Sequence, residues 1–225
     1  MAAQNTLSEN GAKRGKAVLA PVTARGEATR RRILDAAEAV FGEQGYYEAS
    51  VSEITRRAGV AQGTFYLYFP GKRDIFVELV EDLGKRLRVA TSMAIAGATD
   101  RLEIERLGYE AFFHFVAAHR RVYSIVQEAE RVAPEAAQSY YHHIADGYQR
   151  GLEQAMRDGS INILDAEATA YALMGIAHFA ALRWLIWPQH ESESPEIPSI
   201  PPQIFASIME FIAHGFNPLS STDHA

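Results

Sequence analysis

The stretch from Ser50 to Lys72, SVSEITRRAGVAQGTFYLYFPGK, decides the fold. It opens with a Ser-x-x-Glu capping box, in which the first serine accepts from the amide of Glu53 and the Glu53 side chain reaches back. Gly59 then allows a tight turn, and a second short helix is expected to end before Pro70. Two short helices joined by a glycine-containing turn outline a helix-turn-helix, here over about residues 51–70.

Helices are also expected on both sides of this stretch. Upstream, apolar residues recur at helical spacing and predict a core-facing helix that Gly45 ends. Those residues are Ile33, Ala36, Ala37, Val40 and Phe41. Further helical segments are expected at about residues 72–88, 101–119, 121–131, 134–157, 165–187 and 201–216. No strand pattern competes, so the sequence predicts an all-α protein.

Charge is distributed unevenly along the chain. The net charge is −6, yet residues 1–73 hold eleven Lys and Arg against seven Asp and Glu, while the remainder holds eleven against 21. This asymmetry indicates a basic, DNA-facing end on an acidic body, although charges on a solvated surface also segregate by chance. Residues 1–27 are polar and lack periodicity, so we expect a flexible basic arm there.

Several classes of protein are disfavoured by the sequence. It has no cysteine, which excludes disulfides, a thiolate nucleophile and cysteine-ligated zinc. It contains no HExxH, nucleophile elbow, P-loop or GxGxxG motif, so we expect no enzyme activity, no metal and no cofactor. The apolar stretch 166–187 is interrupted by Glu167, His178 and Arg183, and we interpret it as a buried helix of a cytoplasmic protein without a membrane partner.

Taken together, the motifs between residues 31 and 72 resemble the DNA-binding domain of the TetR family. They are Arg31–Ala37, Phe41–Gly42, Gly45–Tyr46, Ser50–Ile54, Ala58–Val60 and Gly63–Lys72. The resemblance covers about residues 28–88. It implies a helix-turn-helix domain there and a helical domain at 89–225 for ligand binding and dimerisation.

DNA contacts are expected mainly from the second helix of the motif. Gln62 has the groups to pair with an adenine edge, Gly63 permits close backbone approach, and Thr64 suits a thymine methyl group or a phosphate. The resemblance adds phosphate-binding tyrosines and a lysine. The predicted DNA-binding residues are Ser52, Gln62, Gly63, Thr64, Tyr66, Tyr68 and Lys72.

Some residues of the motif are expected to have structural roles or to depart from the family pattern. Phe65, Leu67 and Phe69 are expected in the core, and Tyr66 is also compatible with packing. Ala61 stands where the family usually has Ser or Thr, so the second helix lacks a side-chain N-cap, at a cost of about 1 kcal/mol.

The C-terminal half is rich in aromatic residues, which suits either a pocket for an apolar ligand or a solid aromatic core. The predicted ligand-binding residues are Tyr109, Phe113, Tyr123, Tyr141, Met174 and His178. A histidine in such a place is more often a satisfied core residue than a ligand contact, and both interpretations of His178 stay open. The resemblance implies that the last two helices form a dimer interface. Its predicted residues are Gly175, Phe179, Leu182, Phe205, Ile208 and Ile212.

The expected function is that of a repressor that binds palindromic, double-stranded operator DNA as a homodimer and is released by a small hydrophobic effector. Segments 124–152 and 172–179 are similar to regulators that sense acyl-coenzyme A or aromatic acid thioesters. Arg120, Arg121 and Arg131 are then candidates for phosphate binding, or else surface ion-pair partners. The alternatives are a drug-sensing efflux regulator and a ligand-binding protein of the same fold without specific DNA binding.

Overall fold

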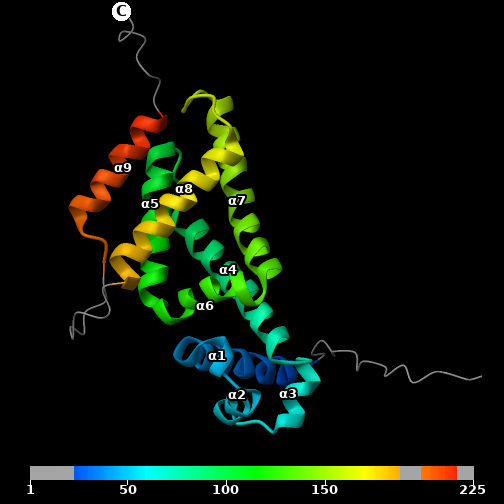
Figure 1. The fold of residues 1–225 in the computed structure, drawn as a ribbon. Coiled ribbons are helices and arrows are strands. Elements are labelled where there is room, and N and C mark those ends of the chain that lie inside the picture. Colours follow the sequence, from blue (N-terminus) through cyan, green and yellow to red (C-terminus); the bar gives the residue numbers. More distant parts are fainter. Residues whose placement is uncertain (1–22, 188–198, 217–225) are drawn as a thin grey trace, which may run out of the picture.

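The computed structural model describes residues 23–187 and 199–216, and within these ranges it contains helices and no strand, which confirms the predicted all-α class. In chain order the elements are α1 (Ala24–Glu48), α2 (Val51–Ala58), α3 (Gln62–Tyr68), α4 (Lys72–Ala94), α5 (Arg101–Ala118), α6 (Arg120–Val132), α7 (Pro134–Arg157), α8 (Ala166–Ala181), the π-helix η1 (Leu182–Ile186) and α9 (Pro202–Phe216). Helices α1–α3 lie together at the base of Figure 1, and α4 rises from them into the helices above.

Helix α1 begins earlier and ends later than expected. Thr23 caps it by accepting from the amide of Gly26, so the expected flexible arm is wrong for its last residues, 24–27, which are helical. The rest of the arm lies outside the described residues. Gly45 does interrupt the helix, with a φ of +74° that favours glycine, but helical structure resumes and continues to Glu48.

The helix-turn-helix forms largely as predicted. Ser50 accepts from the amide of Glu53 at 3.2 Å, and Gly59 adopts a left-handed φ of +64° between α2 and α3. The second hydrogen bond of the predicted capping box, from the Ser50 amide to the Glu53 side chain, does not form. The Glu53 carboxylate is bound by Arg56 and Arg57 instead. Two arginines in the last turn of α2 attract this carboxylate more strongly than one backbone amide does.

One apolar core joins the base of the molecule to the helices above it. It contains the predicted face of α1, Phe65 and Phe69 of α3, and the apolar stripe of α4. Residues of α6 and α7, among them Ile125 and Tyr140, belong to the same cluster. Gly84 permits close contact of α4 with α7, because a Cβ atom there would lie 2.8 Å from the Tyr140 ring.

A second apolar core lies higher, between α5, α7, α8, η1 and α9, and Phe112 packs against both cores. Ala166–Ile186 is long and apolar enough to cross a membrane by length and composition alone. In this fold the helix packs on α7 and α5, with Ala170, Leu173 and Leu185 buried. Figure 1 shows α9 at the outer edge of the molecule, beside α5.

Candidate DNA interface and effector cavity

The outer surface of α3 is made of the residues predicted to contact DNA. Gln62, Gly63 and Tyr66 are exposed, and a Cβ atom at Gly63 would meet nothing within 4 Å. Thr64 and Tyr68 are half-buried. Such a surface, with small and hydrogen-bonding groups outward, suits entry into a major groove.

One residue of this region differs from expectation, whereas the predicted DNA contact of Ser52 stays a prediction. Leu67 was expected in the core but is 52% exposed, because a seven-residue helix buries only one side and Phe65 and Phe69 occupy it. Ser52 is exposed on α2, where its hydroxyl lies 3.0 Å from that of Ser50. As expected, Ala61 provides α3 with no side-chain cap.

Lys72 has an internal role that the sequence did not reveal. Its Nζ donates to the carbonyl oxygens of Tyr46 at 2.7 Å, Tyr47 at 3.2 Å and Ala49 at 2.8 Å. These three bonds use all three hydrogens of the ammonium group. The same cation lies 4.5 Å from the centre of the Tyr46 ring. A phosphate contact by Lys72 would have to replace one of these bonds. In this structure Lys72 holds the end of α1 against the start of α4.

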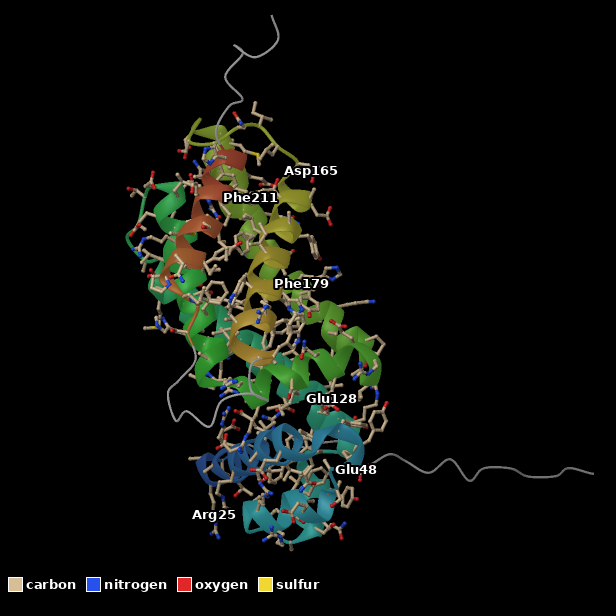
Figure 2. The ribbon with its side chains drawn as sticks, turned by 60° about the vertical axis from the view of Figure 1, so that its left-hand side comes forward. Arg25, Glu48, Glu128, Asp165, Phe179 and Phe211 are labelled. Atoms are coloured by element: carbon tan, nitrogen blue, oxygen red, sulfur yellow. The ribbon has the colours of Figure 1, made fainter. Side chains whose placement is uncertain are left out.

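Two exposed side chains of α1 were not singled out from the sequence. Tyr47 is 69% exposed and directly follows the residue that packs on Lys72. Arg25, in the first turn of α1, is exposed and is labelled at the lower edge of Figure 2. The clustering of Arg25, Arg30, Arg31 and Arg32 in one helix was the available signal, but Arg30 and Arg31 form ion pairs with Glu78 and Asp82 of α4.

A cavity of about 820 Å³ lies between α4, α5, α7 and α8. Five of the six predicted ligand-binding residues line it: Tyr109, Tyr123, Tyr141, Met174 and His178. The prediction for Phe113 is wrong, since its side chain is buried against Phe205 of α9. Its neighbour Phe112 lines the cavity instead. Adjacent residues of a helix point about 100° apart, so only one of the two aromatic rings can face inward.

Polar groups occupy distinct places around this cavity. At the DNA-proximal end, the Tyr123 hydroxyl and Nδ1 of His178 share a 2.5 Å hydrogen bond. Burial raises the pKa of Tyr123 and lowers the pKa of His178, so both groups are held neutral at pH 7. At the start of α5, Arg101 and Glu105 form a buried ion pair.

The exposed part of the cavity lining carries charged groups of both signs, among them the carboxylate of Asp158. Arg88 of α4 and His143 and Arg150 of α7 line the cavity, together with Asp146, and the three α7 residues are exposed. The arginines proposed from sequence do not line it. Arg120 is half-buried at the start of α6, Arg121 pairs with Glu43, and Arg131 lines a different cleft.

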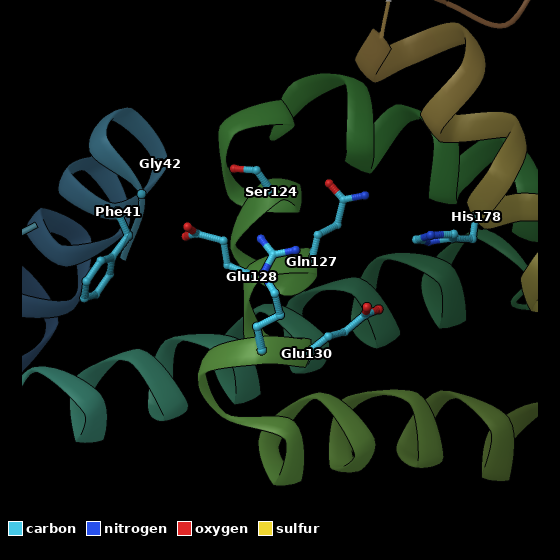
Figure 3. A pocket seen from close by; sticks show the side chains of 9 residues that line it. Phe41, Gly42, Ser124, Gln127, Glu128, Glu130 and His178 are labelled. Atoms are coloured by element: carbon cyan, nitrogen blue, oxygen red, sulfur yellow. The ribbon is translucent and has the colours of Figure 1, made fainter. Parts of the chain in front are cut away.

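That second cleft, of about 440 Å³, is lined by residues of α1 and α6 beside the contact between these helices, and it reaches His178 of α8 (Figure 3). Figure 3 shows Glu128 pointing from α6 toward α1, with His178 on the opposite side of the cleft. Glu128 accepts a 2.9 Å hydrogen bond from the amide of Tyr46, next to the kink at Gly45. Helix α6 therefore contacts the DNA-binding region with Glu128 and the effector cavity with Tyr123.

The predicted dimer-interface residues fall into two groups. Phe179 is 65% exposed, and a Cβ atom at Gly175 would meet only open space, so both face outward from α8. Leu182 and Ile212 are buried, and Phe205 and Ile208 are half-buried against the same core, so these four pack within the subunit. Phe211, which was not predicted, is 70% exposed on α9, and Figure 2 shows it above Phe179.

Comparison with known proteins agrees with this geometry. The profile of the family described as "Bacterial regulatory proteins, tetR family" matches residues 33–79. The uncharacterized HTH-type transcriptional regulator YdgC of Bacillus subtilis is 29% identical over 201 residues, which cover 86% of this chain and 95% of that protein. The HTH-type transcriptional activator FasR of Mycolicibacterium smegmatis is 27% identical over 157 residues, covering 69% and 72% of the two chains.

A solved structure shares the whole fold. The transcriptional regulator FadR of Bacillus subtilis, solved with stearoyl-CoA, superposes with a TM-score of 0.67 at 22% identity, covering 83% of this chain and 99% of FadR. The helix-turn-helix, the helical domain behind it and the matched relatives agree. The helix-turn-helix region of this chain belongs to the TetR family of bacterial regulatory proteins, and relatives matched over most of the chain are transcriptional regulators.

Proposed function

We propose that this chain is a repressor that binds a palindromic operator as a homodimer and releases it when an acyl thioester occupies the cavity. The observation that carries the proposal is the cavity itself: an apolar, aromatic-lined space joined to the DNA-binding region by α6. Its volume of about 820 Å³ lies within the range of small-molecule sites. FadR, which shares the fold, binds stearoyl-CoA.

Two arginines of the cavity lining offer hydrogen-bond donors to the anionic carrier of a thioester. The acyl chain would lie against Tyr109, Phe112 and Met174, while the phosphates of coenzyme A would remain outside, near Arg88 and Arg150. A drug-like effector without phosphates would need only the apolar part of the cavity lining. The fold shared with FadR, which was solved with stearoyl-CoA, favours the acyl thioester over the efflux-regulator alternative.

The remaining assignments follow from the same arrangement. We place the DNA-binding domain at 28–88 and the effector-binding and dimerisation domain at 89–225, with Phe179 and Phe211 at the dimer contact. Ala166–Ile186 acts as a core helix of a cytoplasmic protein. The chain acts by binding, without catalysis, since both of its ligands are recognised by shape and hydrogen bonding.

The direct test is a titration of the protein into a DNA fragment that carries its own upstream region, at a fixed salt concentration. Gln62→Ala and Tyr66→Phe should each weaken binding about fivefold or more, and Tyr171→Phe, an exposed tyrosine on α8, is the matched control. Addition of decanoyl-CoA should release the DNA. Weak, sequence-independent binding would instead favour a ligand-binding protein without operator specificity.

A further inference from the structure

A cluster of three polar side chains lies in one wall of the cavity, apart from the charged groups at its exposed side. Arg101 and Glu105 stand one turn apart at the start of α5 and are 7% and 1% exposed, respectively. Nη2 of Arg101 donates to Oε1 of Glu105, and the hydroxyl of Tyr148, from α7, donates to Oε2 at 3.2 Å. All three residues line the cavity.

A buried ion pair such as this one is weak evidence of a role in stability. Burying two charges costs free energy that their attraction only partly returns, and apolar replacements of such pairs are often neutral or stabilising. Gly151 of α7 leaves room for the pair, because a Cβ atom there would lie 2.9 Å from Nη1 of Arg101. A costly pair that a neighbouring helix accommodates indicates a role in binding.

The cluster also contains hydrogen-bonding capacity that the protein does not use. Both oxygens of Glu105 have donors, whereas Nε of Arg101 is buried without a partner among the described residues. Nε itself has almost no accessible surface, so a cavity ligand with an acceptor oxygen would bond the guanidinium at Nη1, which makes no hydrogen bond to any described residue. The position of the cluster beside Ile104 and Tyr109 places that oxygen next to an apolar body.

The charge of the cluster determines which acceptor fits. Glu105 already compensates the positive charge of Arg101, so a ligand carboxylate would meet a second carboxylate at close range. We propose that Arg101, Glu105 and Tyr148 form a specificity site that accepts the carbonyl oxygen of an ester or thioester and rejects the free acid. This inference rests on the proposed binding of an acyl effector in the cavity.

Three probes of similar size test it: methyl decanoate, decyl methyl ether, which lacks the carbonyl group, and decanoate. Their affinities for the full-length protein are compared by calorimetry at pH 8. The wild-type protein should bind the ester about tenfold more tightly than the ether, as one hydrogen bond to a charged donor allows. Equal binding of ester and ether would overturn the proposal without any variant.

Two variants separate the hydrogen bond from the charge. In Arg101→Met/Glu105→Met the wall becomes apolar, and the preference for the ester over the ether should disappear. In Glu105→Gln the charge of Arg101 is uncompensated, and the affinity for decanoate relative to the ester should rise about tenfold. The matched control is Arg106→Met/Glu103→Met, an ion pair on the same helix that is about 40% exposed and does not line the cavity.

Operator release by decanoyl-CoA is measured on the same preparations. An ester preference without any change in operator affinity would leave the specificity site standing and refute the proposed regulation. Release of the operator without an ester preference would refute the specificity site and leave the proposed regulation intact. An ester preference that survives the double substitution would likewise refute the specificity site. Absence of binding by all three probes and by decanoyl-CoA would refute both.

Discussion

The amide nitrogen of Tyr46 donates a 2.9 Å hydrogen bond to a carboxylate oxygen of Glu128, which ties the end of α1 to α6. The contact is tight, since a Cβ atom at Gly45 would lie 3.0 Å from the other carboxylate oxygen. Three residues from Glu128, on the same helix, Ile125 is fully buried in the core that α1 and α4 share. A displacement of α6 by an effector must therefore change the position of α1.

Glu128→Ala should weaken this connection, because it leaves the Tyr46 amide without its acceptor. We expect the effect of decanoyl-CoA on operator affinity to fall at least threefold, measured by fluorescence anisotropy with and without the ligand. Glu128→Gln retains an acceptor oxygen and should preserve most of the response. An alanine variant with the wild-type response would show that coupling does not pass through this contact.

Lys72→Met should destabilise the protein by about 1–3 kcal/mol, as measured by denaturant unfolding, because three carbonyl oxygens lose a charged donor. Lys85→Met, at an exposed position of the same helix, is the control and should change the unfolding free energy by less than about 0.5 kcal/mol. Weaker DNA binding with unchanged stability would instead identify Lys72 as a phosphate contact.

Ala61→Ser should increase the unfolding free energy by about 0.5–1 kcal/mol, because a serine hydroxyl at this N-cap can accept from an amide of α3. The backbone is already suited to capping, with φ −68° and ψ 147° at Ala61. Ala61→Val, which cannot cap, should not stabilise. If serine and valine gave the same stability, the uncapped start of α3 would carry no penalty.

Local signals explain why so much of the fold could be predicted. The cap at Ser50 and the turn at Gly59 depend only on residues close in sequence, and both form as expected. The three bonds of Lys72 reach carbonyl groups 23 to 26 residues earlier, so no local pattern reveals them.

The choice of helix face explains the errors in the site. Helical periodicity groups residues on one face but does not say which neighbour that face meets. Phe113 therefore turned out to face α9, while Phe112 lines the cavity. The same ambiguity placed Leu182 in a dimer interface, although it is buried within its own subunit.

Glu53 provides a test by pH. Hydrogen bonds from Arg56 and Arg57 lower its pKa to about 2. A carboxylate with a depressed folded-state pKa stabilises the fold above its unfolded pKa of about 4.3 and loses that contribution as the pH falls toward 2. The wild-type melting temperature should thus fall more steeply than that of Glu53→Gln between pH 4.5 and pH 2.5. Parallel curves would show that the exposed ion pairs contribute nothing.

Phe179 and Phe211 provide the test of dimerisation. Both rings are more than three-fifths exposed, and they lie on α8 and α9, the helices predicted to form the dimer interface. In a symmetric dimer each substituted residue acts on both subunits, so a lysine at either position places charges in an apolar contact twice.

Phe179→Lys should therefore shift the protein from dimer to monomer in light scattering after size exclusion and should reduce operator affinity, since only one half-site is then bound at a time. Met93→Lys is the matched control, because Met93 is 74% exposed but lies on α4, and that variant should remain dimeric. Monomer formation by the control would indicate general destabilisation. Dimers that persist in both Phe179→Lys and Phe211→Lys would place the subunit contact elsewhere on the surface.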